Sequence, residues 1–298
     1  MHQASSAVLV RHRGAVVAER YAAGWDADRP REVASVAKSM VAVLIAMAIG
    51  DGAIRGFDQP AADFIPVWRA DARAGVSLRH LMSMTSGLDD TRLALRGIAG
   101  DQFAINAAAP LRDPPGTRWA YNTAAYHLLF HILARAVGER FDAWADRRLL
   151  APLGMTGARW ITSPGAGEGG PVVNYYSAAA TARDLGRFGD LALGRGVAGD
   201  APLVDAGLLA ALLTPSQALN PSYGLLWWLN RLPGYDAFGR GPALRLPSAP
   251  RDAVAALGAG GQMVVAVPSR EVVIVRQGEA PTSPDFADGL VARVLAAL

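Results

Sequence analysis

The sequence predicts a mixed α/β (α+β) fold: an antiparallel sheet built from the N- and C-terminal hairpins, flanked by helices, and a mostly helical lobe. Three observations support this prediction. Apolar and polar residues alternate near both ends of the chain, as they do in strands. Apolar residues in the middle recur at helical spacing. With 298 residues, of which 51% are hydrophobic and 18% charged, the chain can bury a large core.

Each end of the chain predicts a β-hairpin. Near the N-terminus, "SAVLVRHRGAVVAERYA" alternates around a break at Arg13-Gly14. Near the C-terminus, "GQMVVAVPSREVVIVRQG" places β-branched runs on both sides of "PSR". After Pro284, apolar residues at helical spacing predict a last helix, which we expect to cover the sheet. In the simplest arrangement, the two hairpins pair with each other in one antiparallel sheet.

The middle of the chain predicts helices joined by connectors rich in proline and glycine. The expected helices span residues 36–50, 78–85, 122–138 and 181–196, and the connectors include 111–117 and 163–171. We expect one domain over residues 1–298, with a sheet lobe of about 1–34 and 220–298 and a helical lobe of about 35–219. The functional site would lie in the cleft between the lobes. Two long irregular stretches, 91–110 and 232–252, are expected to shape it.

Composition and charge exclude several classes of protein. The formal net charge of +3 is scattered and forms no basic block, so nucleic-acid binding has no support. The absence of cysteine excludes disulfides, thiolate metal sites and a cysteine nucleophile. The N-terminus lacks the features of a secretion signal, and the apolar run at residues 40–49 is too short to span a bilayer. We expect a cytoplasmic protein, or a periplasmic or secreted one if processed, with no membrane partner.

A serine and the only lysine of the chain lie three residues apart in "ASVAKSM". On the predicted helix, the side chains of Ser35 and Lys38 share one face and can meet. A serine hydroxyl becomes a strong nucleophile when a base takes its proton, and a lysine with a lowered pKa can be that base, whereas arginine stays protonated. Every other Lys or Arg position of the chain holds arginine, so the lysine at position 38 indicates a cation that must be able to lose its proton. The alternative is an N-cap serine beside a solvated lysine.

Several motifs resemble, in order and spacing, those of a known family. They are "ASVAKSM", "VSLRHLMSMTSGLDD" (76–90), "PPGTRWAYNTAAYHLL" (114–129), "LAPLGMTGARW", "TARDLGRFG", "YGLLWW" and "ALGAGGQMVVAVPSREVVIVR" (256–276). The chain resembles, over essentially its whole length, the serine β-lactamase and penicillin-binding-protein superfamily. The matching branch holds class C-like β-lactamases, β-lactamase-fold esterases and 6-aminohexanoate-dimer hydrolases. The resemblance implies a single catalytic domain of β-lactamase/transpeptidase-like fold.

The resemblance also implies roles for particular residues. Ser35 would be the nucleophile, and Lys38 the general base or proton relay. Tyr121, in the second motif, would help to carry the proton to the leaving group. The backbone N–H groups of Ser35 and Ala259 would form the oxyanion hole. Substrate would be cleaved through an acyl-enzyme that water then hydrolyses.

Two motifs depart from the family pattern at positions that bear on substrate. The second motif is usually Tyr-x-Asn, but here Thr123 occupies the asparagine position, with Asn122 beside it. The third is usually Lys-Thr-Gly or His-x-Gly, but here it is Ala256-Leu257-Gly258, without a cation to bind a carboxylate. An arginine from another loop could supply that charge. Asn122, Thr123 and Gly258 are candidate substrate-binding residues. So is Trp228, since one residue of the Trp227-Trp228 pair can face the cleft while the other packs in the core.

These departures favour an esterase or amidase over an efficient β-lactamase. The predicted function is a serine hydrolase of ester or amide bonds, either a carboxylesterase or a 6-aminohexanoate-oligomer-type amidase. It would act on a small molecule without a cofactor or metal, as a monomer or homodimer. The alternatives are a β-lactamase, or a penicillin-binding receptor module that acylates slowly.

Two other motifs carry little weight. Gly165, Gly167 and Gly170 match a dinucleotide-binding pattern, but Pro171 and "VVNYY" follow where a helix would be needed, so a flexible loop near the cleft is expected. His127 and His131 have zinc-ligand spacing, but no third ligand is evident, so both are expected in the core.

Overall fold

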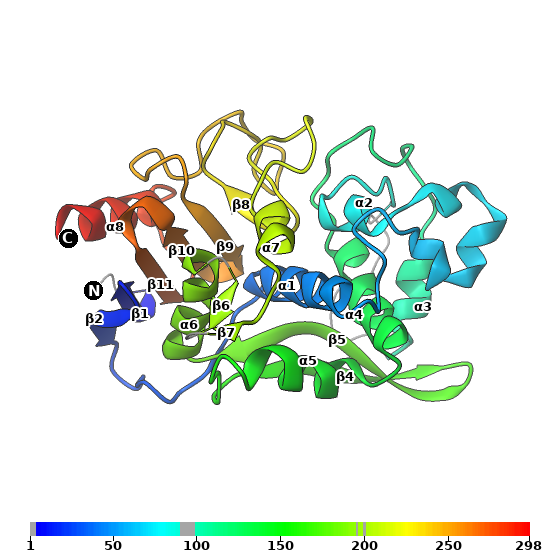
Figure 1. The fold of residues 1–298 in the computed structure, drawn as a ribbon, viewed down its shortest axis with the longest axis horizontal. Coiled ribbons are helices and arrows are strands. Elements are labelled where there is room, and N and C mark those ends of the chain that lie inside the picture. The colour runs from blue at the N-terminus through cyan, green and yellow to red at the C-terminus, as the bar shows by residue number, and fades with distance from the viewer. Residues whose placement is uncertain (1–3, 90–98, 195, 199–200) are drawn as a thin grey trace.

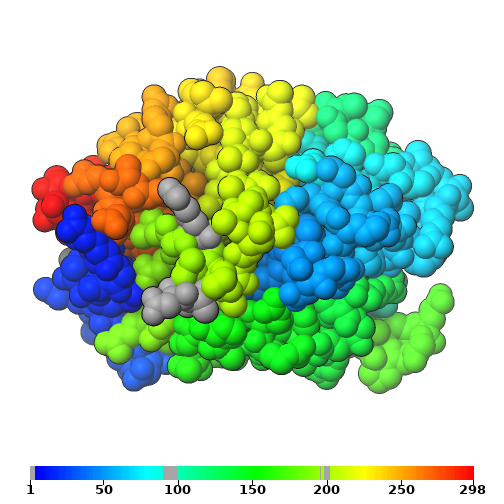
Figure 2. Space-filling view, viewed as in Figure 1, coloured from blue at the N-terminus to red at the C-terminus, as the bar shows by residue number. Residues whose placement is uncertain are grey.

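The computed structural model describes residues 4–89, 99–194, 196–198 and 201–298. Its main sheet has six antiparallel strands in the order β2-β1-β11-β10-β9-β8 (Figure 1). The strands are β1 (Ser5–His12), β2 (Ala15–Tyr21), β8 (Trp228–Leu229), β9 (Val254–Gly258), β10 (Gln262–Val267) and β11 (Val272–Gly278). The N- and C-terminal hairpins pair through β1 and β11, as predicted, with Leu9 opposite Val275. In the space-filling view, segments from the two ends of the chain accordingly lie together (Figure 2).

Helices cover the main sheet. The strands β10 and β11 are buried at every position, in keeping with the apolar runs at residues 263–267 and 272–275. Helix α6 (Ala182–Leu193) packs on β1, β10 and β11. Its Gly189 permits this approach, because a Cβ there would come within 2.4 Å of the Val273 side chain. The last helix, α8 (Phe286–Ala296), buries Val291 and Leu295 beside the sheet (Figure 1).

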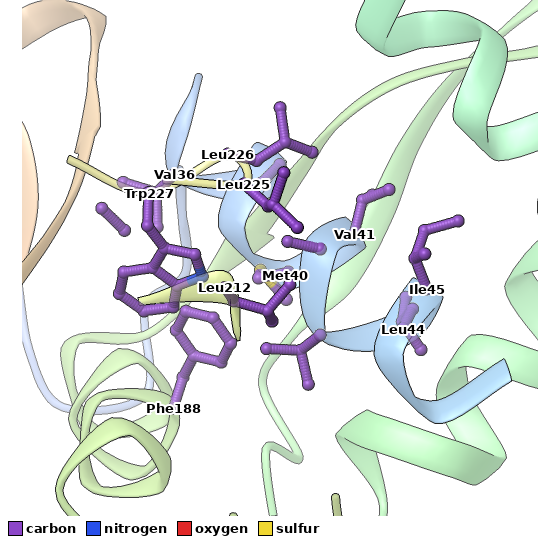
Figure 3. Close-up of a cluster of buried hydrophobic side chains, with 14 of the residues drawn as sticks. Val36, Met40, Val41, Leu44, Ile45, Phe188, Leu212, Leu225, Leu226 and Trp227 are labelled. Atoms are coloured by element: carbon purple, nitrogen blue, oxygen red, sulfur yellow. The ribbon is translucent and has the colours of Figure 1, made fainter. Parts of the chain in front are cut away.

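Helix α1 (Val36–Gly50) lies in the centre of the molecule, between the main sheet and the helical part (Figure 1). It is apolar on nearly all sides and buried from Val36 to Ala48, as expected for a core helix. Its N-terminal half packs with Trp227, Phe188 of α6 and Leu212 (Figure 3). Among the described residues, no helix has the length and apolar character needed to cross a bilayer.

The remaining elements surround α1. The α-helices are α2 (Leu78–Met82), α3 (Gln102–Ala107), α4 (Thr123–Val137), α5 (Phe141–Ala145) and α7 (Ala206–Leu212). Short turns of helix lie at Ala61–Asp63, Pro66–Ala70, Ala72–Gly75, Asp146–Leu150, Ala259–Gly261 and Pro268–Arg270. A small hairpin pairs β6 (Val197–Ala198) with β7 (Ala201–Pro202).

Two expectations about the middle of the chain were wrong. Residues 163–171 are no connector: β4 (Arg159–Gly167) and β5 (Gly170–Ala180) form a hairpin, which joins β3 (Arg31–Glu32) in a second sheet. Glycine at 165 serves close backbone approach, since a Cβ there would come within 2.3 Å of the Gly100 carbonyl. Moreover α6, inside the range expected for the helical lobe, packs on the main sheet.

Candidate active site

Ser35 lies at the beginning of α1, directly after a strained residue. Ala34 has a φ of +48°, in the left-handed region that residues with a Cβ seldom adopt. The Ser35 hydroxyl makes no capping hydrogen bond to the helix. Instead it accepts a hydrogen bond from Lys38 Nζ at 3.0 Å. Ser35 thus occupies the N-cap position without a capping bond, and Lys38 is buried, so the alternative of a capping serine beside a solvated lysine is wrong.

Lys38 is a buried amine whose surroundings favour its neutral form. Its side chain projects from the first turn of α1, and the residue is 2% exposed. No carboxylate among the described residues forms a salt bridge with it. Burial lowers the pKa of Lys38 to about 7. The amine next to the Ser35 hydroxyl is thus ready to accept a proton at neutral pH.

Tyr121 lies just before α4 and lines the same cleft as Ser35. Burial raises the pKa of Tyr121 to about 12, although the neighbouring Ser35 hydroxyl and the charge of Arg245 act in the opposite direction. The phenol is therefore protonated at neutral pH. Its ring stacks on Trp228 with centroids 5.9 Å apart and meets Tyr223 edge-on at 6.3 Å, which holds the hydroxyl in place.

Gly258 brings the end of β9 against the backbone of the nucleophile. A Cβ at this position would lie 2.4 Å from the Val33 carbonyl oxygen and 3.1 Å from the Ser35 nitrogen. The absence of a side chain thus allows Ala259, the next residue, to line the same cleft as Ser35. That the N–H groups of Ser35 and Ala259 form an oxyanion hole in this cleft stays a prediction.

The change Gly258→Ala should therefore impair the site more than the fold. The backbone at Gly258 has ordinary extended dihedral angles, so the added methyl acts through the clash alone. We expect kcat/KM to fall by about 10²-fold, as for a misplacement of about 1 Å, and the free energy of unfolding to fall by about 1–3 kcal/mol. Gly169→Ala, where the new Cβ meets nothing within 4 Å, is the matched control. An unchanged kcat/KM in Gly258→Ala would contradict this role.

The predicted residues line one cleft, with three exceptions, of which Lys38 is the buried neighbour of Ser35. The cleft has a volume of about 360 Å³, and its lining includes Ser35, Tyr121, Trp228, Gly258 and Ala259. Asn122 and Thr123 lie outside this lining. Asn122 was expected to bind substrate, but it caps α4: its Oδ1 accepts from the Ala125 N–H at 2.8 Å, and its Nδ2 donates to the Leu88 carbonyl at 2.9 Å. Thr123 is the first residue of the helix.

The tryptophan pair divides between the cleft and the core. Trp228 lines the cleft. Trp227 is buried and stacks on Phe188, with ring centroids 5.6 Å apart (Figure 3). Neighbouring residues in extended backbone point to opposite sides, which is why only one of the two reaches the cleft.

Sequence reasoning missed Arg245 and Tyr126. Arg245 comes from the stretch 232–252, which was expected to shape the cleft, but no local pattern singles it out; its guanidinium lies 4.2 Å from the Trp228 ring centroid. Tyr126 belongs to the second motif. Lys38 Nζ lies 4.5 Å from its ring centroid and 5.1 Å from that of Tyr121. Part of the other stretch, 91–110, lies outside the described residues.

The ring of Tyr126 should matter more than its hydroxyl. The hydroxyl is buried without a hydrogen-bond partner, whereas the ring faces the Lys38 amine. We expect Tyr126→Phe to keep wild-type activity and equal or higher stability. Tyr126→Leu removes a cation–π contact that favours the ammonium form. The acid limb of kcat/KM should then move to lower pH, by about 0.5–1 unit. Equal shifts of the pH profile in both variants would contradict a role for the ring.

Of the paired histidines, His127 lies in the core, as expected, whereas His131 is only partly buried. His127 is buried and hydrogen-bonded to the Gln102 amide at 2.9 Å, and His131 packs on the Phe103 ring. Burial lowers the pKa of His131 to about 4. Within the described part of the chain, no group of three or more potential metal ligands gathers.

The fold and the site together define the class of β-lactamase-fold serine hydrolases. The family model described as Beta-lactamase matches residues 1–297, and the chain belongs to this family.

Relatives carry several different activities in their names. The chain is 28% identical over 186 residues to Esterase EstB of Burkholderia gladioli, covering 53% of this chain and 47% of that protein. It is 30% identical over 162 residues to Penicillin-binding protein 4 of Amycolatopsis lactamdurans, covering 52% and 40%. The match thus spans less than half the length of either relative.

Solved structures share the fold at low sequence identity. A Bacillus anthracis protein named as a 6-aminohexanoate-dimer hydrolase aligns with a TM-score of 0.78 at 20% identity, covering 99% of this chain and 80% of that one. A class C beta-lactamase aligns with a TM-score of 0.74 at 20% identity, covering 98% and 90%. At these identities the likeness establishes the fold and leaves the substrate open.

Proposed function

We propose that this protein hydrolyses ester or amide bonds of small molecules through an acyl-enzyme on Ser35. The observation that carries the proposal is the 3.0 Å hydrogen bond between Lys38 Nζ and Ser35 Oγ, made by a buried amine with a lowered pKa. A perturbed titratable group beside a potential nucleophile in a cleft is characteristic of catalysis. Neither feature serves the helix, because the serine does not cap it.

The proposed reaction has two stages. Lys38 takes the proton of Ser35 as Oγ attacks the carbonyl carbon, and the negative charge on the carbonyl oxygen is stabilised by the N–H groups of Ser35 and Ala259. The bond to the leaving group then breaks, and the protonated Tyr121 donates to the leaving atom while Lys38 returns a proton to Tyr121. In the second stage water attacks the acyl carbon and loses a proton to the same pair of residues. The bond between the acyl carbon and Ser35 Oγ then breaks, and the pair passes the proton to Oγ as the acid leaves.

An esterase or amidase activity is favoured over a β-lactamase activity. The third motif of this chain supplies no cation from β9, since Ala256 occupies that position. The names of Esterase EstB and of the 6-aminohexanoate-dimer hydrolase are in keeping with this proposal. One observation favours β-lactam hydrolysis as a second candidate: Arg245, from another segment, places a positive charge in the cleft.

The test is turnover of p-nitrophenyl butyrate and of a chromogenic cephalosporin by the wild-type protein. We expect ester hydrolysis with a much larger kcat/KM than cephalosporin hydrolysis. Fast cephalosporin turnover would replace the proposal with a β-lactamase. If neither substrate turns over but mass spectrometry finds one stoichiometric adduct on Ser35, the protein is a slowly acylating receptor.

A further inference from the structure

Arg276 is a buried cation on β11 whose guanidinium is fully hydrogen-bonded. The residue is 0% exposed, and each N–H group of its side chain has an oxygen acceptor. The carboxylate of Glu279 forms its salt bridge with Arg31, so the hydrogen-bond partners of Arg276 are neutral carbonyl and hydroxyl oxygens. A buried charge is costly unless it is fully hydrogen-bonded, so this set of acceptors indicates a cation with a defined task.

Two of the acceptors belong to the turn that directly follows Ala259. Nη1 of Arg276 donates to the carbonyl of Gly260 at 2.6 Å and to that of Gly261 at 3.1 Å. Both glycines adopt a positive φ, of +75° and +73°, and their consecutive carbonyls share this one donor. On the other side of Ala259, Gly258 packs against the backbone of the nucleophile. The backbone of Ala259 is therefore held from both sides.

The other acceptors attach the guanidinium to the main sheet. Nε donates to Ser5 Oγ at 3.0 Å, and Nη2 donates to the carbonyls of Ala4 and Glu279, both at 2.7 Å. These residues lie at the beginning of β1 and just after β11, two strands that pair side by side (Figure 1). Arg276 thus connects the turn after Ala259 to the paired ends of two strands.

We propose that Arg276 is a positioning residue of the active site, which fixes this turn so that the Ala259 N–H is aligned with the negative charge that develops on the substrate carbonyl oxygen. Donors that are oriented before the reaction stabilise such charge without reorganisation. Arg276 does not line the cleft, so it acts through the backbone alone. The inference rests on the proposed hydrolase function and adds to it a residue that the substrate does not touch.

Two esters that differ in one atom test the inference. p-Nitrophenyl butyrate has a carbonyl oxygen, which accepts strong hydrogen bonds, whereas O-p-nitrophenyl thionobutyrate has a sulfur atom there, which accepts weak ones. Each is measured with wild type, Arg276→Met and Arg276→Lys, because lysine keeps the charge but offers fewer donors. Gln277→Met is the matched control. Gln277 is buried beside Arg276 in the same strand, but it donates to the Ala180 carbonyl in the second sheet at 2.9 Å.

We expect Arg276→Met to lower kcat/KM for the oxygen ester by about 10–100-fold more than for the thionoester, because a displaced N–H loses the stronger acceptor. Arg276→Lys should show a smaller change of the same kind, and it carries the comparison if Arg276→Met does not fold. Gln277→Met should keep the wild-type ratio between the two esters even if it is less stable. The inference is overturned if the Arg276 variants lower both rates by the same factor.

A binding measurement separates this inference from the proposed function. Butylboronic acid forms a tetrahedral adduct with a nucleophilic serine without turnover: boron accepts the electron pair of Ser35 Oγ, and the hydroxyl proton passes to Lys38. Boron NMR titration gives the Kd. A Kd raised about 10–100-fold in the Arg276 variants, but not in Gln277→Met, supports the positioning role even if the wild type hydrolyses neither ester. An unchanged Kd in these variants overturns it, and a wild type without any adduct overturns it together with the nucleophile.

Discussion

Replacing Ser35 with alanine should abolish ester turnover, lowering kcat by about 10⁴-fold or more, because no other group can form the acyl-enzyme. The fold should survive, since the Ser35 side chain makes no capping bond to α1. The free energy of unfolding is expected to change by about 1 kcal/mol, the net value of the hydrogen bond lost to Lys38. Initial rates, with mass spectrometry for a covalent acyl adduct, measure the effect.

Ser39→Ala is the matched control for this prediction. Ser39 lies on the same helix, and its hydroxyl donates to the Leu226 carbonyl at 2.7 Å, away from the cleft. Its loss should lower stability by about 1 kcal/mol and leave kcat unchanged. Residual ester hydrolysis in Ser35→Ala at more than a few per cent of the wild-type rate would point to a different nucleophile.

The substitution Lys38→Arg should lower kcat/KM by about 10²–10⁴-fold, although it keeps a positive charge next to Ser35. Arginine cannot release its proton at any accessible pH, so it cannot act as the base. In the wild type, kcat/KM should rise with pH around a midpoint near 7, where the Lys38 ammonium loses its proton. Full activity in Lys38→Arg would contradict the assignment of the base.

Lys38→Met should be inactive yet more stable than the wild type at pH 7. The pKa of Lys38 is about 7 in the folded protein and about 10.5 in the unfolded chain, so the unfolded chain binds more protons between these values. Stability of the wild type therefore rises with pH across that window. Methionine removes the cost, and we expect an increase of about 2–4 kcal/mol at pH 7 that shrinks towards pH 10. Denaturant unfolding at both pH values measures it, and a less stable variant at pH 7 would contradict the lowered pKa.

Local signals in the sequence were sufficient for the long helices and the terminal hairpins. Helix α4 begins after Asn122, whose side chain caps it, and ends at Gly138, which adopts a φ of +72°. The strands β10 and β11 are apolar β-branched runs that few other structures accommodate. The β4–β5 hairpin gave no such signal, because glycines at residues 165, 167 and 170 resemble a loop. Gly165 and Gly167 instead allow close approach to Gly100 and Asp101, which are distant in the sequence, and Gly170 adopts a positive φ in the turn of the hairpin.

The sequence by itself determined the i, i+3 placement of Ser35 and Lys38 on one helix face, because that spacing depends only on helix geometry. It also determined the family, through motifs that recur in order along the chain. The tertiary structure decided the chemistry of Lys38, since the burial that lowers its pKa depends on packing, with Tyr121 and Tyr126 at its amine drawn from a segment more than 80 residues away. It likewise decided that Arg245 lies in the cleft: the loop that carries Arg245 is placed by its packing on Trp228, which no local pattern encodes.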